Sequence, residues 1–122
     1  MLAGRRVLLV EDEPLISMML EDMLAEVGCV IAGSERDSGG ALAIIESAEL
    51  DAAVLDIHIA DGDSFHLADV LLRRGVPVVF STGVGESEIP AAYQCHPHVT
   101  KPFDLPELEA ALDKVWLRPA AE

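Results

Sequence analysis

The sequence lacks three features that would each define a class of protein. No apolar run approaches the ~20 residues that a membrane-spanning helix needs, and the N-terminus shows neither a signal-peptide core nor a cleavage site. Basic residues are few, since 8 Lys and Arg stand against 22 Asp and Glu, a formal net charge of −14. Nucleic-acid binding needs clustered Lys and Arg. We therefore expect a soluble, cytoplasmic chain that binds neither nucleic acid nor membrane.

Cysteine is scarce as well. Cys29 and Cys95 have neither the density of a disulfide framework nor the spacing of a CxxC motif, so we expect reduced thiols. The length is 122 residues, of which 51% are hydrophobic and 25% charged, a composition typical of a globular protein. This length favours a single domain over residues 1–122, with a frayed tail at about 119–122.

Five short apolar runs alternate with helix-like segments. The clearest runs do not alternate with polar residues, which predicts strands buried on both faces, as in a parallel sheet covered by helices. The order βαβαβαβαβα then predicts an α/β fold with a doubly wound sheet and right-handed crossovers. The predicted strands are residues 7–10, 30–32, 52–55, 76–80 and 98–100.

The predicted helices differ in the strength of their signals. Residues 14–27 carry apolar side chains at helical spacing, including Met19 and Met23, which we expect in the core. The last helix opens with a capping box, in which Glu107 follows Asp104 by three residues. Weaker helices are predicted at about 37–49 and 63–74, and a short or mobile one at 86–94.

Polar residues follow four of the predicted strands. Glu11 and Asp12 follow the first, Asp56 the third, Thr82 the fourth and Lys101 the fifth. Ligands of such a sheet bind beyond the carboxyl ends of the strands, so these groups are expected to meet at one rim. Close carboxylates repel one another unless a cation joins them, and an all-oxygen acidic site suits Mg²⁺. Asp56 is then a candidate nucleophile toward a phosphoryl group, whose oxygens Thr82 and Lys101 would stabilise.

Each of these residues alone also fits a helix cap, a turn or a solvated loop charge, but together they resemble a known family over essentially the whole chain. Four motifs look like the receiver domains of two-component response regulators: Val7-Leu8-Leu9-Val10-Glu11-Asp12-Glu13, Val54-Leu55-Asp56, Thr82-Gly83 and Lys101-Pro102-Phe103. The resemblance implies a flavodoxin-like (βα)5 fold with strand order 2-1-3-4-5. It also implies that Asp56 is the phospho-acceptor and that Thr82 and Lys101 bind and sense the phosphoryl group. Mg²⁺ would be held by Glu11, Asp12, Asp56 and the backbone carbonyl of His58.

The same resemblance implies a single-domain response regulator. It would accept its phosphoryl group from a sensor histidine kinase and then control a downstream signalling protein, or relay the phosphate to a phosphotransferase. Such a protein catalyses only its own phosphorylation and dephosphorylation, and we expect a monomer or weak dimer. The alternative is a pseudo-receiver, an interaction module that acts without phosphorylation, but the intact acidic pair, Asp56, Thr82 and Lys101 favour the first interpretation.

Two departures from the family pattern concern switching. His98 stands where receivers usually carry Tyr or Phe, and residues 59–62 lack the usual proline after the phospho-acceptor. The run from Phe80 to Gly85 is similar to that of the "FAT GUY" subgroup of stand-alone receivers from alphaproteobacteria. This similarity implies that the loop 82–88, with Gly83 and Gly85, and the fourth helix carry the signal.

Two other protein classes with related chemistry fit less well. A flavodoxin binds its flavin phosphate in a hydroxyl- and glycine-rich loop, where this chain has acidic residues 11–13 that would repel a phosphate. A haloacid-dehalogenase-type phosphatase has a second Asp two residues after its nucleophile, where this chain has His58. The four histidines also lack the spacing of a zinc site.

Overall fold

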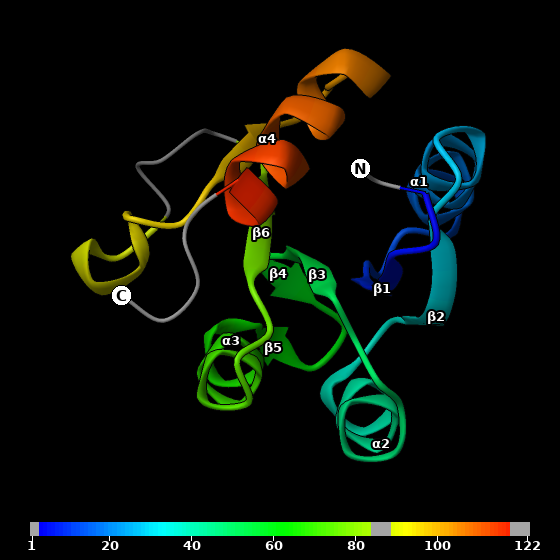
Figure 1. Cartoon of the computed structure of the whole chain (residues 1–122). Coiled ribbons are helices and arrows are strands. Elements are labelled where there is room, and N and C mark those ends of the chain that lie inside the picture. Colours follow the sequence, from blue (N-terminus) through cyan, green and yellow to red (C-terminus); the bar gives the residue numbers. More distant parts are fainter. Residues whose placement is uncertain (1–2, 84–88, 118–122) are drawn as a thin grey trace.

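A computed structural model describes residues 3–83 and 89–117, the last two by their backbone alone (Figure 1). Five parallel strands form one sheet in the order β2-β1-β3-β6-β7. Two short strands, β4 (His58–Ile59) and β5 (Gly62–Asp63), form a separate antiparallel hairpin. The order in the main sheet is therefore the predicted 2-1-3-4-5, and the flavodoxin-like α/β fold is confirmed. The main strands are β1 (Arg6–Val10), β2 (Val30–Glu35), β3 (Ala52–Asp56), β6 (Val78–Thr82) and β7 (His98–Thr100).

The sheet separates two apolar clusters, one on each face. The helices α2 (Ser38–Ser47) and α3 (Phe65–Arg73) cover one face, and α1 (Pro14–Glu26) and α4 (Leu105–Leu117) cover the other (Figure 1). Within β1, Leu8 and Val10 join the first cluster while Val7 and Leu9 join the second. Apolar residues on both faces explain why the strand sequences do not alternate.

Two of the predicted helix starts, those of α2 and α4, are confirmed by their hydrogen bonds. The Asp37 side chain accepts a hydrogen bond of 2.9 Å from the Gly40 amide at the start of α2. Before α4, the Asp104 carboxylate accepts from the Glu107 amide and the Glu107 carboxylate accepts from the Asp104 amide, both at 3.0 Å. Each bond satisfies an amide that the first helical turn leaves without a partner.

The prediction that Met19 and Met23 of α1 lie in the core is wrong for Met19, whose side chain is 54% exposed. The helix presses Leu20 and Leu24, one turn apart, against the sheet. Met23 is half-buried at the edge of the same cluster. Helical spacing groups these side chains correctly but does not say how wide a stripe the sheet covers.

The segment between β6 and β7 is only partly described. Residues 84–88 lie outside the described part, and with them most of the loop 82–88 and the start of the predicted fourth helix. What the structure describes of that helix is one turn of 3₁₀ helix, η2 (Ala91–Tyr93). The predicted frayed tail also lies outside it. Across residues 3–83 and 89–117, no helix combines the length and apolar character that crossing a bilayer requires.

Candidate functional site

Three carboxylates meet where β1 and β3 end. Because Val10 pairs with Leu55 in the parallel register, the next residues, Glu11 and Asp56, lie side by side. With Asp12 they form a cluster whose carboxylate oxygens all lie within 4.8 Å of one another. Glu11 and Asp56 are buried, whereas Asp12 is half-exposed. The cluster therefore has buried walls and one side open to solvent.

The ammonium of Lys101 reaches this cluster from the end of β7. Its Nζ lies 3.1 Å from Glu11 Oε1 and 3.2 Å from Asp56 Oδ2. The backbone amide of Lys101 donates to the Thr82 carbonyl at 2.7 Å, which fixes the base of the side chain against β6. Burial lowers the pKa of Lys101, but the charges of Asp56 and then Glu11 outweigh it and raise that pKa. The lysine is therefore held as a cation.

The carboxyl of Glu11 lies in an environment that disfavours its charged form. Burial and then the Asp56 charge raise the pKa of its carboxyl to about 7, although Lys101 opposes the shift. Its Oε1 is at ion-pair distance from Lys101 but accepts no well-aligned hydrogen bond among the described residues. One ammonium does not balance three carboxylates. The all-oxygen donor set, and a buried oxygen that accepts no hydrogen bond among the described residues, fit a divalent cation such as Mg²⁺.

The other predicted site residues lie at the same edge of the sheet. Asp56 pairs with Ser81, so the buried Thr82 lies one residue beyond it at the end of β6. His58 follows Asp56 by two residues and opens the β4–β5 hairpin. The candidate switch position, His98, is half-buried at the start of β7, where it pairs with Phe80.

Sequence reasoning missed the β4–β5 hairpin, although a signal for it was present. Asp61-Gly62 is a dipeptide that favours turns, although the two turn residues of this hairpin are Ala60 and Asp61 and Gly62 begins β5. Gly62 has a φ of +139°, which side chains disfavour. Two-residue strands are too short to show any hydrophobic periodicity. The hairpin begins two residues after the predicted phospho-acceptor.

An aromatic cluster was also not foreseen. Tyr93 of η2 stacks on Phe65 at 4.9 Å between ring centroids, and its ring edge meets Phe80 at 6.0 Å. The Tyr93 hydroxyl donates a hydrogen bond of 2.7 Å to Asp69 Oδ1 on α3. This cluster connects η2 to α3 and to the strand that ends in Thr82.

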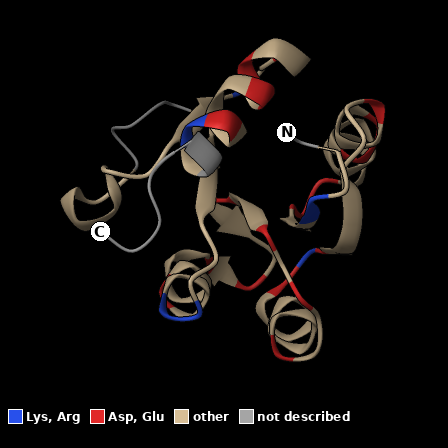
Figure 2. Ribbon diagram, viewed as in Figure 1, with Lys and Arg blue, Asp and Glu red and all other residues tan. Residues whose placement is uncertain are grey.

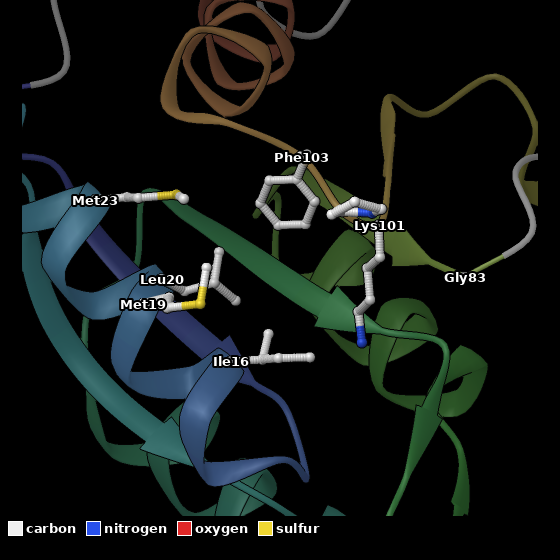
Figure 3. Close-up of a pocket in the computed structure, with 8 residues that line it drawn as sticks. Ile16, Met19, Leu20, Met23, Gly83, Lys101 and Phe103 are labelled. Carbon is white, nitrogen blue, oxygen red and sulfur yellow. The ribbon is translucent and has the colours of Figure 1, made fainter.

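Two pockets flank the acidic cluster, and they differ in character. A polar pocket of about 320 Å³ is lined by Glu11 and Asp12 together with residues from α1 and the end of β2. An apolar pocket of about 380 Å³ lies between α1 and the segment after β7 (Figure 3). Lys101 lines the apolar pocket, and in Figure 3 its ammonium extends away from Phe103 toward the end of β3. Its lining residues are Ile16, Met19, Leu20, Met23, Gly83, Lys101, Pro102 and Phe103.

Comparison with known proteins gives one consistent result. The family model of the response regulator receiver domain matches residues 7–113. The solution structure of SdrG from Sphingomonas melonis Fr1 superposes with a TM-score of 0.84 at 35% identity, covering 95% of this chain and 98% of that one. The transcriptional regulatory protein TcrA of Mycobacterium tuberculosis is 34% identical over 115 residues, which is 90% of this chain and 45% of TcrA. The chain thus spans about half the length of the curated relatives it matches.

A further solved structure bears on the acidic cluster. The receiver domain of a sensor histidine kinase from Pseudomonas aeruginosa superposes with a TM-score of 0.76 at 26% identity, covering 92% of this chain and 97% of that one. That structure has a magnesium ion coordinated in its active site cleft.

SdrG supports the resemblance to stand-alone receivers of alphaproteobacteria, although the "FAT GUY" subgroup itself stays a prediction. Receiver domains in general are phospho-acceptor switches that bind Mg²⁺ in an acidic pocket. The match over residues 7–113, the sheet order and the acidic cluster agree, and the chain belongs to the family of response regulator receiver domains.

Proposed function

We propose that this protein is a single-domain response regulator of the cytoplasm, over residues 1–122, and that Asp56 accepts its phosphoryl group from a sensor histidine kinase. One observation carries the proposal. Asp56 ends a buried strand with its Oδ2 3.2 Å from Lys101 Nζ and beside the carboxylates of Glu11 and Asp12. A carboxylate placed between a cation and an acidic pocket suits nucleophilic attack on a phosphoryl group.

The chemistry needs few parts. A carboxylate oxygen of Asp56 forms a bond to phosphorus while the bond from phosphorus to the donor's imidazole nitrogen breaks, and its electron pair leaves with the imidazole. The transferred group carries negative charge on its equatorial oxygens, which positioned cations and donors stabilise. Lys101 supplies an ammonium beside Asp56, and the Thr82 hydroxyl at the end of β6 is the proposed second donor.

The proposed metal site consists of Glu11, Asp12, Asp56 and the backbone carbonyl of His58. When bound, Mg²⁺ would neutralise phosphoryl oxygens and the excess carboxylate charge. Support comes from the three carboxylates within 4.8 Å and from the buried Oε1 of Glu11, which accepts no hydrogen bond among the described residues. Few protein ligands leave waters on the ion, so we expect weak binding that phosphate completes.

Incubation with acetyl phosphate and Mg²⁺, followed by intact-mass measurement, tests the phospho-acceptor. The wild-type protein should gain one phosphoryl mass, and Asp56→Asn should gain none. Asp63→Asn is the matched control, because it neutralises an exposed carboxylate at the end of the same loop and should be labelled like wild type. Labelling that persists in Asp56→Asn would assign the wrong nucleophile. A wild-type protein that takes no label from the kinase or from acetyl phosphate would be a pseudo-receiver.

The proposed output is contact with another protein, either a downstream signalling protein or a phosphotransferase that takes the phosphate. Acidic residues lie on α1, α2 and α4 (Figure 2). This surface, on a chain of net charge −14, favours a basic partner surface. We propose a monomer or weak dimer, and sedimentation with and without acetyl phosphate would measure this directly.

A further inference from the structure

A second polar cluster lies beside the site, where the β4–β5 hairpin meets the start of α2. The carboxylate of Asp61, at the hairpin turn, accepts hydrogen bonds from the Ser38 amide at 3.1 Å and from the Ser38 hydroxyl at 3.2 Å. The Ser38 hydroxyl also lies 2.8 Å from Nε2 of His66 on α3. Three elements that are separate in sequence therefore meet at one buried hydroxyl.

The direction of these bonds follows from the protons available. A carboxylate can only accept, so the single hydroxyl proton of Ser38 goes to Asp61. The remaining partner of that oxygen, His66 Nε2, must then be the donor. The result is a directed chain from imidazole N–H through hydroxyl to carboxylate. Such bonds to a charged acceptor are stronger than neutral ones. Consistent with this, the Ser38 amide bond lowers the pKa of Asp61.

The hairpin is held to the β2–α2 connection at a second point. The Ala60 amide donates to the Arg36 carbonyl at 3.0 Å. A proline has no amide hydrogen, so the bond depends on the absence of proline at this residue. On its inner side the hairpin buries Ile59 in the core. His58, which precedes Ile59, thus begins a hairpin that is fixed by Ala60, Asp61 and Ile59.

We propose that Asp61, oriented by Ser38 and His66, is a positioning residue for the metal site. It holds the β4–β5 hairpin against the start of α2 and so fixes the backbone of His58, the proposed carbonyl ligand. The inference rests on the proposed function, because it concerns the geometry of that metal site. Residues that do not bind the metal but hold its ligands in position through hydrogen bonds increase the affinity for the metal.

The test is a Mg²⁺ titration of the unphosphorylated full chain. Backbone amide NMR at constant pH and ionic strength reports the binding at each Mg²⁺ concentration. Asp61→Ala should raise the Mg²⁺ Kd by about 10-fold, at the low end of the losses seen for outer ligand-orienting groups. Asp61→Asn keeps an acceptor oxygen for Ser38 and should stay within about 2-fold of wild type, since the orienting bonds survive.

Asp63→Ala is the matched control. It removes the same charge from the same hairpin, but the Asp63 carboxylate accepts only a local bond from the Phe65 amide at 3.2 Å among the bonds described. Its Kd should stay near the wild-type value. If Asp61→Ala does not fold, Ser38→Ala provides the second variant. It breaks the chain to His66 while leaving the backbone amide, and a Kd raised by about 3-fold is expected.

Phosphorylation kinetics separate a positioning role from a general loss of structure. In Asp61→Ala the concentration of Mg²⁺ giving half-maximal rate with acetyl phosphate should rise, while the rate at saturating Mg²⁺ stays close to wild type. Equal Kd changes in Asp61→Ala and Asp63→Ala, or none in either, would overturn the inference and leave Asp56 untouched as acceptor. A wild-type chain that binds no Mg²⁺, or an Asp12→Asn variant that binds it normally, would instead overturn the metal site itself, and the inference with it.

Discussion

The two halves of the sheet differ in the length of their elements and in the site residues that they carry. The half formed by β2, β1 and β3 has strands of 5 or 6 residues, covered by α1 of 13 residues and α2 of 10. On the other side, β6 also has 5 residues, but the edge strand β7 has only 3, and the described residues between β6 and β7 form only η2, also of 3 residues. All three carboxylates come from the first half, whereas Thr82 and Lys101 come from the second.

This difference indicates a division of labour. Charges that repel one another need a rigid frame, and the long strands provide it. Lys101, the proposed phosphoryl-sensing cation, follows the three-residue strand β7, and short elements with little packing open at lower free energy. Lys101 connects the halves, because its backbone bonds to Thr82 while its ammonium contacts Glu11 and Asp56.

The largest effect should come from the strained carboxyl of Glu11 in the first half. Its pKa is about 7 in the folded chain and near the ordinary value of 4.5 when unfolded. The folded state therefore keeps a proton that the unfolded state releases between these values, and stability falls as pH rises through this window. The decrease should reach up to about 3 kcal/mol in metal-free buffer.

Urea unfolding between pH 4.5 and pH 7 measures this dependence, with Glu11→Gln as the reference variant. The variant should lack the decrease that Glu11 causes, because it has no proton to lose at this position. If the free energy of unfolding depends on pH in the same way in wild type and in Glu11→Gln, the pKa of the Glu11 carboxyl is not raised by folding.

A matched pair of core truncations compares the two halves directly. Val54 in the central strand β3 and Val99 in the edge strand β7 belong to the same apolar cluster. Val54→Ala should lower the free energy of unfolding by about 2–3 kcal/mol, because neighbours on both sides limit collapse around the cavity. Val99→Ala should cost about 1–2 kcal/mol, because β7 relaxes more easily. Thermal unfolding of both variants is the measurement, and equal losses would contradict the comparison.

The cap at the start of α4, in the second half, should contribute less to the free energy of unfolding. Asp104→Ala removes one acceptor of the reciprocal cap and should cost about 1 kcal/mol. Glu109→Ala, further along the same helix, is the control and should change stability by no more than about 0.5 kcal/mol. Calorimetry on both variants decides, and indistinguishable melting temperatures would mean that the cap adds nothing to the folded chain.

The smallest loss of stability is expected for a substitution in η2. Tyr93→Phe keeps the stack on Phe65 but removes the hydroxyl donor to Asp69, which should cost less than about 1 kcal/mol. The bond to Asp69 raises the pKa of the Tyr93 phenol, so Asp69→Asn should lower it. Because Tyr93 is the only tyrosine of the chain, an ultraviolet absorbance titration reports it alone. An unchanged midpoint in Asp69→Asn would show that η2 is not held there.

Sequence alone was sufficient for the parts of the fold that depend on long patterns. Buried runs predicted the parallel sheet, and the residues at the ends of three strands predicted the cluster of Glu11, Asp12, Asp56 and Lys101. Both follow from the rule that parallel strands end at one edge. The capping box before α4 and the Asp37 cap of α2 were equally readable, because each depends on residues three positions apart.

What sequence did not predict depends on contacts between distant segments. Nothing local to Ser38 indicates that Asp61, 23 residues later, bonds to it. Nor does the spacing of Met19 along the helix show that its side chain is exposed while that of the next residue, Leu20, is buried. The pKa of Glu11 likewise depends on burial and on the Asp56 charge, which exist only once β1 and β3 are paired.

The connection between α3 and β6 has a practical consequence for engineering this protein. It turns at Gly75, an exposed residue with a φ of +79° and open space where a side chain would stand. This turn precedes β6, whereas the acidic cluster lies beyond the strands' carboxyl ends. At Gly28, by contrast, an added Cβ would lie 3.2 Å from Ala3. A short epitope tag or fluorophore-bearing peptide inserted at Gly75 should therefore leave phosphorylation intact, which makes this turn the place to attach a reporter.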